Sequence, residues 1–232
     1  MNIDNLKKQA AEKAVEQVQS GMVIGLGTGS TTNFAIKKIA ELLQSGKLKD
    51  IAGIPTSKAT EDLAKSLNIP LTSFYEKQEI DLTIDGADEV DEELNLIKGG
   101  GGALLREKIV AQASKREIII VDESKLSKKL GEKWAVPIEV LKYCVQLEKK
   151  FLESLGAKIE LRKDKEGKPY ITDEGNYILD SNFGVINSPK ELTQKLEARA
   201  GIVEHGIFIN LVSEVIVASQ EGIKILKKIK KS

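Results

Sequence analysis

Two short stretches near the middle of the sequence bring acids, a lysine and a run of glycines close together along the chain. The first runs from Asp85 to Asp91, and the second runs from Lys98 through Gly99–Gly102 to Glu107 and Lys108. Four consecutive glycines lose more backbone entropy on ordering than other residues, but they allow positive φ and close approach of N–H groups to a ligand. This composition favours a ligand-binding loop over a plain connection.

The helix expected after the glycines places Glu107 on an apolar face. The residues three and four positions away are all apolar: Ala103, Leu104, Val110 and Ala111. A carboxylate on such a face loses hydration, which raises its pKa toward neutrality unless a cation compensates, and a general base needs a carboxylate of that kind. The alternative is a half-exposed glutamate that pairs with Lys98 or another nearby cation.

A second glycine-rich loop, Gly25-Leu26-Gly27-Thr28-Gly29-Ser30, follows the first apolar strand. A dinucleotide fingerprint requires Gly or Ala where Ser30 stands, and no Lys-Ser or Lys-Thr pair makes a P-loop. Free N–H groups at a helix start, with hydroxyls from Thr28, Ser30 and Thr31, instead suit a phosphate monoester. A simple N-cap would account for only one of these hydroxyls.

The acids between Asp85 and Asp91 do not form a calcium loop. An EF-hand requires Gly at its sixth position, where Val90 stands. A magnesium site remains open on the pattern alone, but the sequence offers no phosphate-transfer partner for it.

Together these motifs resemble the ribose-5-phosphate isomerase type A family, over essentially the whole chain and in the family's order and spacing. The stretches that carry the resemblance are Gly25–Thr32, Ile54–Ser57, Asp85–Asp91, Lys98–Lys108, Val121–Lys125 and Ile171–Asn176.

The resemblance implies a metal-free and cofactor-free interconversion of ribose 5-phosphate and ribulose 5-phosphate through an enediolate. Glu107 would carry the proton between C2 and C1, while Lys98 and backbone N–H groups of Gly99 to Gly101 would stabilise the enediolate. Asp85 and Asp88 would hold sugar hydroxyls, with Asp85 as the proton shuttle for ring opening or between O1 and O2. The residues expected to bind substrate are Thr28, Gly29, Ser30, Thr31, Asp85, Gly86, Ala87, Asp88, Lys98, Gly99, Gly100, Gly101 and Lys125.

The elements expected to position these residues alternate between strand and helix. We predict helices over 4–20, Thr31–Leu43, Ser57–Leu67 and Gly102–Ala113, and strands over Met22–Leu26, Ile51–Ile54, Ile80–Ile84 and Ile118–Val121. Such alternation predicts an α/β fold, a Rossmann-like, mostly parallel sheet with helices on both faces and ligand-binding loops at the carboxyl ends of its strands. We assign residues 1–132 and 208–232 to this catalytic domain.

Residues 133–207 follow the βαββαβ order of a ferredoxin-like α+β domain inserted into the first. We predict strands over Val136–Leu141, Lys158–Lys163, Tyr177–Phe183 and Ile202–Ile207, and helices over Val145–Leu155 and Pro189–Ala198. After a strand within Ile209–Ala218, a lysine-rich amphipathic helix carrying Lys227, Lys228, Lys230 and Lys231 is expected to complete the first domain.

Composition argues against several classes of partner. Lysine plus arginine equals aspartate plus glutamate at 35 each, so no global field favours nucleic acid or an anionic membrane. No apolar run approaches the roughly 20 residues of a membrane span, and the first residues form a charged helix rather than a secretory signal, so we expect a cytoplasmic protein. The single cysteine, Cys144, is expected to be core or near-core filler, and the single histidine, His205, to lie at a strand end or turn rather than to act in catalysis.

The expected partner is therefore a small phosphosugar, and the expected assembly is a homodimer or homotetramer built through the smaller domain. One rival is a sugar-phosphate sensor, but sensors of this architecture carry a helix-turn-helix, and only one helix precedes the first strand here. Other rivals are an amino-sugar phosphate isomerase, a sugar lactonase or a coenzyme A transferase of the same fold. The segment from Lys98 to Glu107 favours the pentose phosphate.

Overall fold

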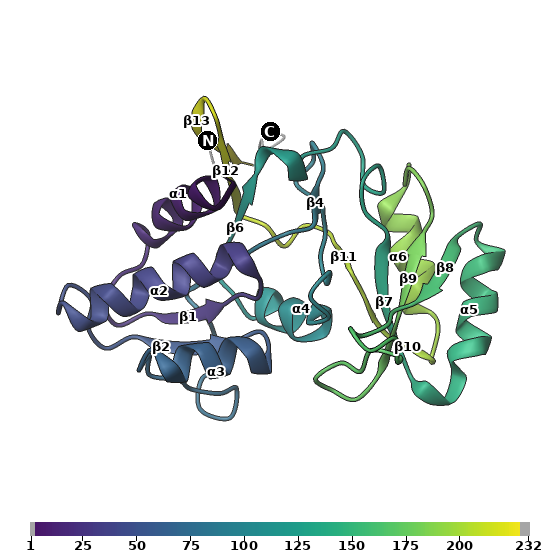
Figure 1. The fold of residues 1–232 in the computed structure, drawn as a ribbon, viewed down its shortest axis with the longest axis horizontal. Coiled ribbons are helices and arrows are strands. Elements are labelled where there is room, and N and C mark those ends of the chain that lie inside the picture. The colour runs from purple at the N-terminus through teal and green to yellow at the C-terminus, as the bar shows by residue number, and fades with distance from the viewer. Residues whose placement is uncertain (1–2, 228–232) are drawn as a thin grey trace. The chain divides into compact units, whose positions relative to one another are not determined.

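Five apolar strands pair in parallel at the centre of a six-stranded sheet in the computed structural model, which describes residues 3–227 (Figure 1). The sheet order is β13-β12-β6-β3-β1-β2. Its members and flanking helices are α1 (Ile3–Val15), β1 (Val23–Leu26), α2 (Ser30–Gln44), β2 (Ala52–Pro55), α3 (Lys58–Ser66), β3 (Leu82–Asp85), α4 (Leu104–Gln112), β6 (Glu117–Asp122), β12 (Glu214–Ser219) and β13 (Gly222–Lys227). Strands that are apolar on both faces suit a parallel sheet that is covered on both sides.

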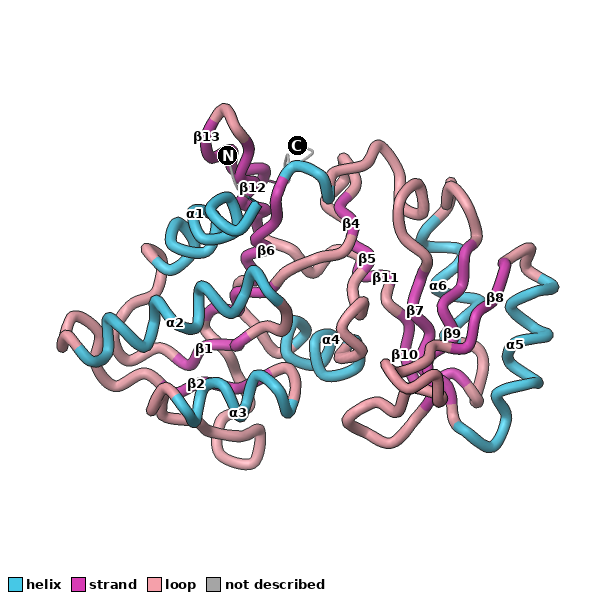
Figure 2. The backbone as a smooth tube through the Cα atoms, in the orientation of Figure 1, coloured by secondary structure: helices cyan, strands magenta, loops and turns pink. Residues whose placement is uncertain are grey.

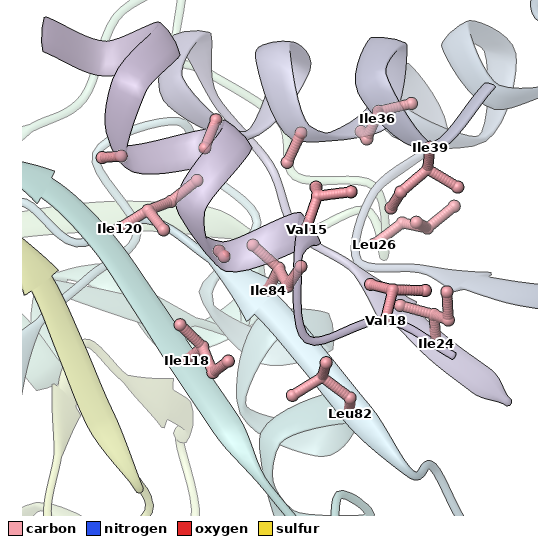
Figure 3. Packing of buried hydrophobic residues seen from close by; sticks show 14 of the residues in the cluster. Val15, Val18, Ile24, Leu26, Ile36, Ile39, Leu82, Ile84, Ile118 and Ile120 are labelled. Atoms are coloured by element: carbon pink, nitrogen blue, oxygen red, sulfur yellow. The ribbon is translucent and has the colours of Figure 1, made fainter. Parts of the chain in front are cut away.

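Helices cover both faces of this sheet, as predicted. On one face, α1 and α2 bring Val15, Ile36 and Ile39 against alternate residues of the strands, including Ile24 and Ile84 (Figure 3). The other face carries a smaller apolar cluster of Ile54, Ile80 and Val110, the last of which belongs to α4. Gly25 lets α4 approach closely, because a Cβ at position 25 would lie 2.7 Å from Cγ1 of Val110.

The end of the described chain is a strand, so the predicted lysine-rich helix is wrong over residues 222–227. β13 pairs antiparallel with β12, with Ser219 opposite Gly222, and Gly222 has a φ of 119°. The alternating residues Ile223 and Ile225 fit a strand as well as a helix. The tight turn between Ser219 and Gly222 favours the hairpin. Lys228, Lys230 and Lys231 lie outside the described residues.

The second compact unit contains the predicted ferredoxin-like arrangement. Its elements are β7 (Val136–Val140), α5 (Val145–Ser154), β8 (Lys158–Leu161), β9 (Tyr177–Asn182), α6 (Pro189–Glu197) and β10 (Ile202–His205). The strands pair antiparallel in the order β10-β7-β9-β8, and Figure 2 shows α5 running alongside them. The unit has its own apolar core, which includes Ile138, Leu152, Leu179 and Leu196.

A third, small sheet was not predicted. It joins β4 (Glu89–Val90), β5 (Leu96–Ile97) and β11 (Ile207–Phe208) in the order β11-β5-β4. The strand predicted over Ile202–Ile207 therefore splits at Gly206 into β10 and β11, which belong to different sheets. Gly206 allows the change because a Cβ there would lie 2.3 Å from the carbonyl oxygen of Lys98. The pairs are too short for a periodicity to be visible in the sequence.

The boundaries of the two units differ from the predicted domains. The first unit comprises residues up to Ala87, Arg106–Lys125 and the residues from Leu211 onward, and the second comprises Asp88–Leu105 and Leu126–Asn210. The predicted split at 133 and 207 left 88–105 with the parallel sheet, because β4 and β5 had not been foreseen. Helix α1 also ends at Val15 rather than at residue 20.

The single cysteine and the single histidine of the sequence both lie in the second unit. Cys144 is only partly buried, which leaves the near-core of the two expected positions, and its Sγ lies 3.7 Å from the carbonyl oxygen of Leu141. His205 ends β10, as expected, and is buried with Nε2 3.5 Å from a carboxylate oxygen of Glu197. In the described part of the chain, no helix combines the length and the hydropathy that a membrane crossing demands.

Candidate functional site

The loop after β1 leads directly into the N-terminus of α2. Gly29 occupies the N-cap position with a φ of 120°, and within the described residues no side chain caps the helix. Helix N-termini leave N–H groups unsatisfied and carry partial positive charge. Ser30 and Thr31 begin the helix, and Gly29 and Ser30 are exposed, so this end of α2 can receive an anion.

Lys7 contributes a cation to this loop that the sequence analysis missed. Its Nζ donates a hydrogen bond of 3.0 Å to Oγ of Ser30, although the two residues lie on different helices. The side chain of Lys7 is only 19% exposed and is 4.0 Å from the well-exposed carboxylate of Asp4. No local motif marks Lys7, because its relation to the loop depends on how α1 crosses α2.

The hydroxyl of Thr28 lies in a network of hydroxyl groups that reaches the start of α3. Its Oγ1 lies 2.7 Å from Oγ1 of Thr56 and 2.8 Å from Oγ of Ser57, which also caps α3 by accepting from the N–H of Thr60. The Oγ1 of Thr60 in turn donates to the carbonyl oxygen of Gly27 at 3.0 Å. The network therefore anchors the loop after β1 to the start of α3.

Asp85, the last residue of β3, is fully buried and contacts the same loop. Its Oδ1 accepts hydrogen bonds from the N–H of Thr28 at 3.1 Å and from the N–H of Gly86 at 2.7 Å. The carboxyl ends of β1 and β3 lie side by side, since the N–H of Gly27 donates to the carbonyl oxygen of Ile84. Asp85 and Thr28 are thus brought together as the sequence predicted for loops at one sheet edge.

Glu107 lies in the first turn of α4 and is only 5% exposed. The apolar positions three and four residues away, Leu104, Val110 and Ala111, are buried with it. The predicted buried face is confirmed, and the half-exposed alternative is wrong. Its place in the first turn gives the carboxylate the favourable field of the helix N-terminus.

Lys98 is among the largest fully buried side chains of the described chain, with 1% exposure. Its Nζ lies 5.6 Å from the centre of the Phe208 ring, and its N–H donates to the carbonyl oxygen of Gly206. A buried ammonium keeps a strong field because little water screens it. Lys98 follows the end of β5 and immediately precedes the four glycines, so this field acts at the start of the glycine loop.

The glycine loop, Gly99–Gly102, turns tightly after Lys98. The N–H of Gly102 donates to the carbonyl oxygen of Gly99 at 2.9 Å, and both residues have positive φ values. The N–H of Gly100 donates to Oδ2 of Asp88 at 2.7 Å. Asp88 and the glycine loop are thus joined by a contact that the sequence did not predict, and the N–H of Gly100 is engaged by this carboxylate.

The remaining predicted residues lie at loop ends. Gly86 and Ala87 follow β3 and are partly exposed. Lys125 is also partly exposed and ends the 3-10 helix η1 (Glu123–Lys125), which follows β6.

Within residues 3–227, no three His, Cys, Asp or Glu side chains gather in a way that could hold a metal ion. The acids of residues 85–91 are instead spread over both units.

Comparison with known proteins gives one consistent result. Residues 52–222 match the family described as ribose 5-phosphate isomerase A (phosphoriboisomerase A). The chain is 58% identical over 224 residues to ribose-5-phosphate isomerase A of Desulfatibacillum aliphaticivorans, covering 97% of each chain. It superposes on the ribose 5-phosphate isomerase of Plasmodium falciparum with a TM-score of 0.94 and 46% identity, over 99% of this chain and 100% of that one. A solved D-ribose-5-phosphate isomerase in complex with phospho-erythronic acid gives a TM-score of 0.96 at 43% identity, over 98% and 100%.

Proposed function

The chain belongs to the ribose 5-phosphate isomerase A family and interconverts ribose 5-phosphate and ribulose 5-phosphate, and from this premise we propose that Glu107 is the general base. The observation that carries the proposal is the burial of this carboxylate at 5% exposure in the first turn of α4. A carboxylate with little hydration accepts a proton from carbon more readily than one in bulk water.

The proposed reaction moves one proton between carbons and one between oxygens. Glu107 removes the proton on C2 of the open-chain aldose, the electron pair forms the C1–C2 double bond, and the former carbonyl becomes an oxyanion on C1. Return of the proton to C1, with loss of the O2 proton and gain of one at O1, gives the 2-ketose. A positioned base contributes roughly 10²- to 10⁴-fold in rate.

Lys98 and the glycine loop are proposed to stabilise the enediolate. The ammonium of Lys98 is almost fully buried, so its attraction for a developing oxyanion is screened little by water. The N–H groups of Gly99 and Gly101 are proposed as donors to the same charge. The N–H of Gly100 serves differently, since its hydrogen bond to Asp88 orients that carboxylate for a sugar hydroxyl.

Asp85 is proposed to shuttle the proton between O1 and O2 and to assist ring opening. Its Oδ1 is held by the N–H groups of Thr28 and Gly86, which leaves the orientation of the carboxyl group fixed. Gly86 and Ala87, which continue from β3, are proposed to line the path of the sugar through their backbone.

The phosphate is proposed to bind at the N-terminus of α2. The supporting features are the uncapped N–H groups at Gly29 to Thr31, the hydroxyls of Ser30 and Thr31, and the ammonium of Lys7. Thr28 is proposed to hold the loop in place around the phosphate, because its hydroxyl belongs to the network with Thr56 and its N–H donates to Asp85. Lys125 is proposed as a second cation for the phosphate.

We extend the proposal to the setting of the reaction. A phosphorylated pentose is charged and crosses lipid bilayers poorly, which favours action in the cytoplasm, within the non-oxidative pentose phosphate pathway. The chemistry assigned to Glu107 and Lys98 requires no metal ion, so we propose that the reaction is independent of metal. We also propose that the working assembly is a homodimer or homotetramer. Neither nucleic acid nor a membrane is proposed as a partner.

Replacement of Glu107 tests the proposal. Glu107→Gln keeps the shape of the side chain but cannot accept the proton, so we expect turnover of ribose 5-phosphate in EDTA to be lost while phospho-erythronic acid binds within about tenfold of the unaltered affinity. Glu139→Gln, at a buried glutamate of the second unit, is the matched control and should keep its activity. Near-native turnover by Glu107→Gln contradicts the assignment of the base, and loss of activity in EDTA contradicts metal independence.

A further inference from the structure

Two side chains outside the matched motifs, Arg162 and Tyr170, hold the carbonyl oxygens of the glycine loop. Nη1 of Arg162 donates to the carbonyl oxygen of Gly99 at 2.8 Å and to that of Gly100 at 3.1 Å. The hydroxyl of Tyr170 donates to the carbonyl oxygen of Gly101 at 3.3 Å. Three successive carbonyls of the loop are therefore engaged by side chains of one β-hairpin segment, which leaves β8 and returns toward β9.

Asp180 fixes the orientation of the Arg162 guanidinium. Nε and Nη2 of Arg162 donate to the two carboxylate oxygens of Asp180 at 2.9 and 2.5 Å, and both side chains are largely shielded, with 14% and 28% exposure. A two-point pair of this kind holds the guanidinium plane. The remaining nitrogen, Nη1, is consequently directed at the glycine loop.

Tyr170 is placed by the same hairpin. Its N–H donates to the carbonyl oxygen of Arg162 at 2.9 Å, so the two residues are neighbours. Burial first, and then the carboxylate of Asp173, raises the pKa of the Tyr170 phenol, which keeps it a hydrogen-bond donor. Gly102 makes room for it, because a Cβ at position 102 would lie 2.4 Å from the phenol oxygen.

The held carbonyls determine where the loop N–H groups point. In a trans peptide the C=O of one residue and the N–H of the next point in opposite directions, and the described residues contain no cis peptide. The carbonyl of Gly99 faces Arg162, and the N–H of Gly100 on the far side reaches Asp88. By the same geometry, the carbonyl of Gly100 on Arg162 turns the N–H of Gly101 away from the guanidinium.

We propose that Arg162 is a positioning residue for the isomerisation, which fixes and polarises the Gly99–Gly100 and Gly100–Gly101 peptides so that the Gly101 N–H stabilises the enediolate. The inference rests on the proposed role of the glycine loop. A cation on a peptide oxygen draws electron density from the amide and strengthens its N–H as a donor. A loop of four glycines needs such support, because glycine alone does not restrict its own backbone.

Arginine suits this task better than lysine. The planar guanidinium serves Asp180 and two carbonyl oxygens at once, whereas an ammonium at the end of a flexible chain lacks that fixed geometry. We therefore expect Arg162→Lys to recover only part of the function that Arg162→Met loses.

The test separates kcat from KM. For Arg162→Met we expect kcat for ribose 5-phosphate to fall about 10- to 100-fold with KM within about threefold, since the lost interaction strengthens in the transition state. The affinity for phospho-erythronic acid should fall while inhibition by inorganic phosphate stays unchanged, because phosphate alone uses the N-terminus of α2. Lys168→Met is the matched control, since Lys168 lies on the same hairpin and its ammonium pairs with the exposed Glu166 rather than with the glycine loop among the described contacts.

The outcomes are distinct from those that test the base. Unchanged kcat in Arg162→Met, or equal weakening of phospho-erythronic acid and inorganic phosphate, overturns the positioning role. If Arg162→Met does not fold, Tyr170→Phe and Asp180→Asn provide smaller changes to the same contacts. Unchanged kcat in both of these variants also overturns the positioning role. Loss of kcat in these variants together with full turnover by Glu107→Gln supports the positioning role and rejects only Glu107 as the base.

Discussion

The carboxylate of Asp85 lies so close to the backbone of Gly27 that no side chain fits at position 27. A Cβ built on Gly27 would lie 2.3 Å from Oδ1 of Asp85 and 2.6 Å from its Cα. The close approach allows Oδ1 to accept from the N–H of Thr28, one residue further on. The glycine therefore serves the contact between two strand ends.

Gly27→Ala is predicted to destabilise the first unit. The Cα of Asp85 belongs to a fully buried strand and cannot rotate away, so β1 and β3 must separate locally, at a cost of about 1 to 3 kcal/mol. Urea unfolding measures the change. Gly86→Ala is the control for stability, since a Cβ there meets no atom closer than 3.9 Å. Equal midpoints for Gly27→Ala and the unaltered chain contradict the contact.

Asp85→Asn is predicted to separate anchoring from proton transfer. The amide oxygen of asparagine can still accept from the N–H groups of Thr28 and Gly86, so stability should change little. Turnover should fall by about 100-fold or more, because the carboxylate that moves protons is gone. Asp85→Ala loses the buried acceptor as well and should also lose about 1 to 3 kcal/mol of stability. Near-native turnover by Asp85→Asn would restrict Asp85 to anchoring.

Lys7→Met is predicted to weaken substrate binding while sparing the chemical step. The Nζ of Lys7 contacts Ser30 at 3.0 Å, and a charge-assisted hydrogen bond contributes roughly 1.5 to 3 kcal/mol, so KM for ribose 5-phosphate should rise at least about tenfold. The effect should shrink in high salt. Lys8→Met is the control, because Lys8 is 56% exposed and contacts Glu12 on the same helix. Equal KM values for both variants contradict the phosphate role.

Local patterns were sufficient for most of the fold. Runs such as Ile118–Val121 and the apolar positions around Glu107 depend on burial and period, which the sequence displays directly. The ferredoxin-like unit followed from the order of its elements. By contrast, β4, β5 and β11 are held by pairing between distant segments, for example Ile207 with Ile97, and two-residue strands carry no period.

The sequence predicted the site residues that directly follow strands of the parallel sheet. It did not predict those that reach the site loops from distant helices or hairpins. Asp85 and Thr28 come after adjacent parallel strands, so their proximity follows from topology. Lys7 and Arg162 reach the loops from a helix and a hairpin far along the chain, and only tertiary packing relates them to Ser30 and Gly99. The hydroxyl of Thr28 was expected beside an anion, but the sequence could not show that Thr56 would engage it.

Glu139 predicts a dependence of stability on pH. Burial raises its pKa above 4.5, the carboxylates of Glu174 and Glu204 add to the rise, and hydrogen bonds from Asn176 and Thr172 oppose it. Folding therefore favours the protonated acid. Its contribution to stability is fully present below the unfolded pKa and is lost as the pH rises through the folded pKa.

Glu139→Gln should consequently stabilise the second unit at neutral pH. The amide oxygen can still accept from Oγ1 of Thr172 and Nδ2 of Asn176, which lie 2.8 and 2.9 Å from Oε1 of Glu139, and glutamine stays uncharged at every pH. The difference in unfolding free energy between the variant and the unaltered chain should be near zero below about pH 4, grow as the pH rises through the raised pKa, and then level off. Urea unfolding at a series of pH values measures it. A difference that is independent of pH, or one that favours glutamate at neutral pH, contradicts the prediction, because either requires a carboxylate that the fold accepts in its charged form.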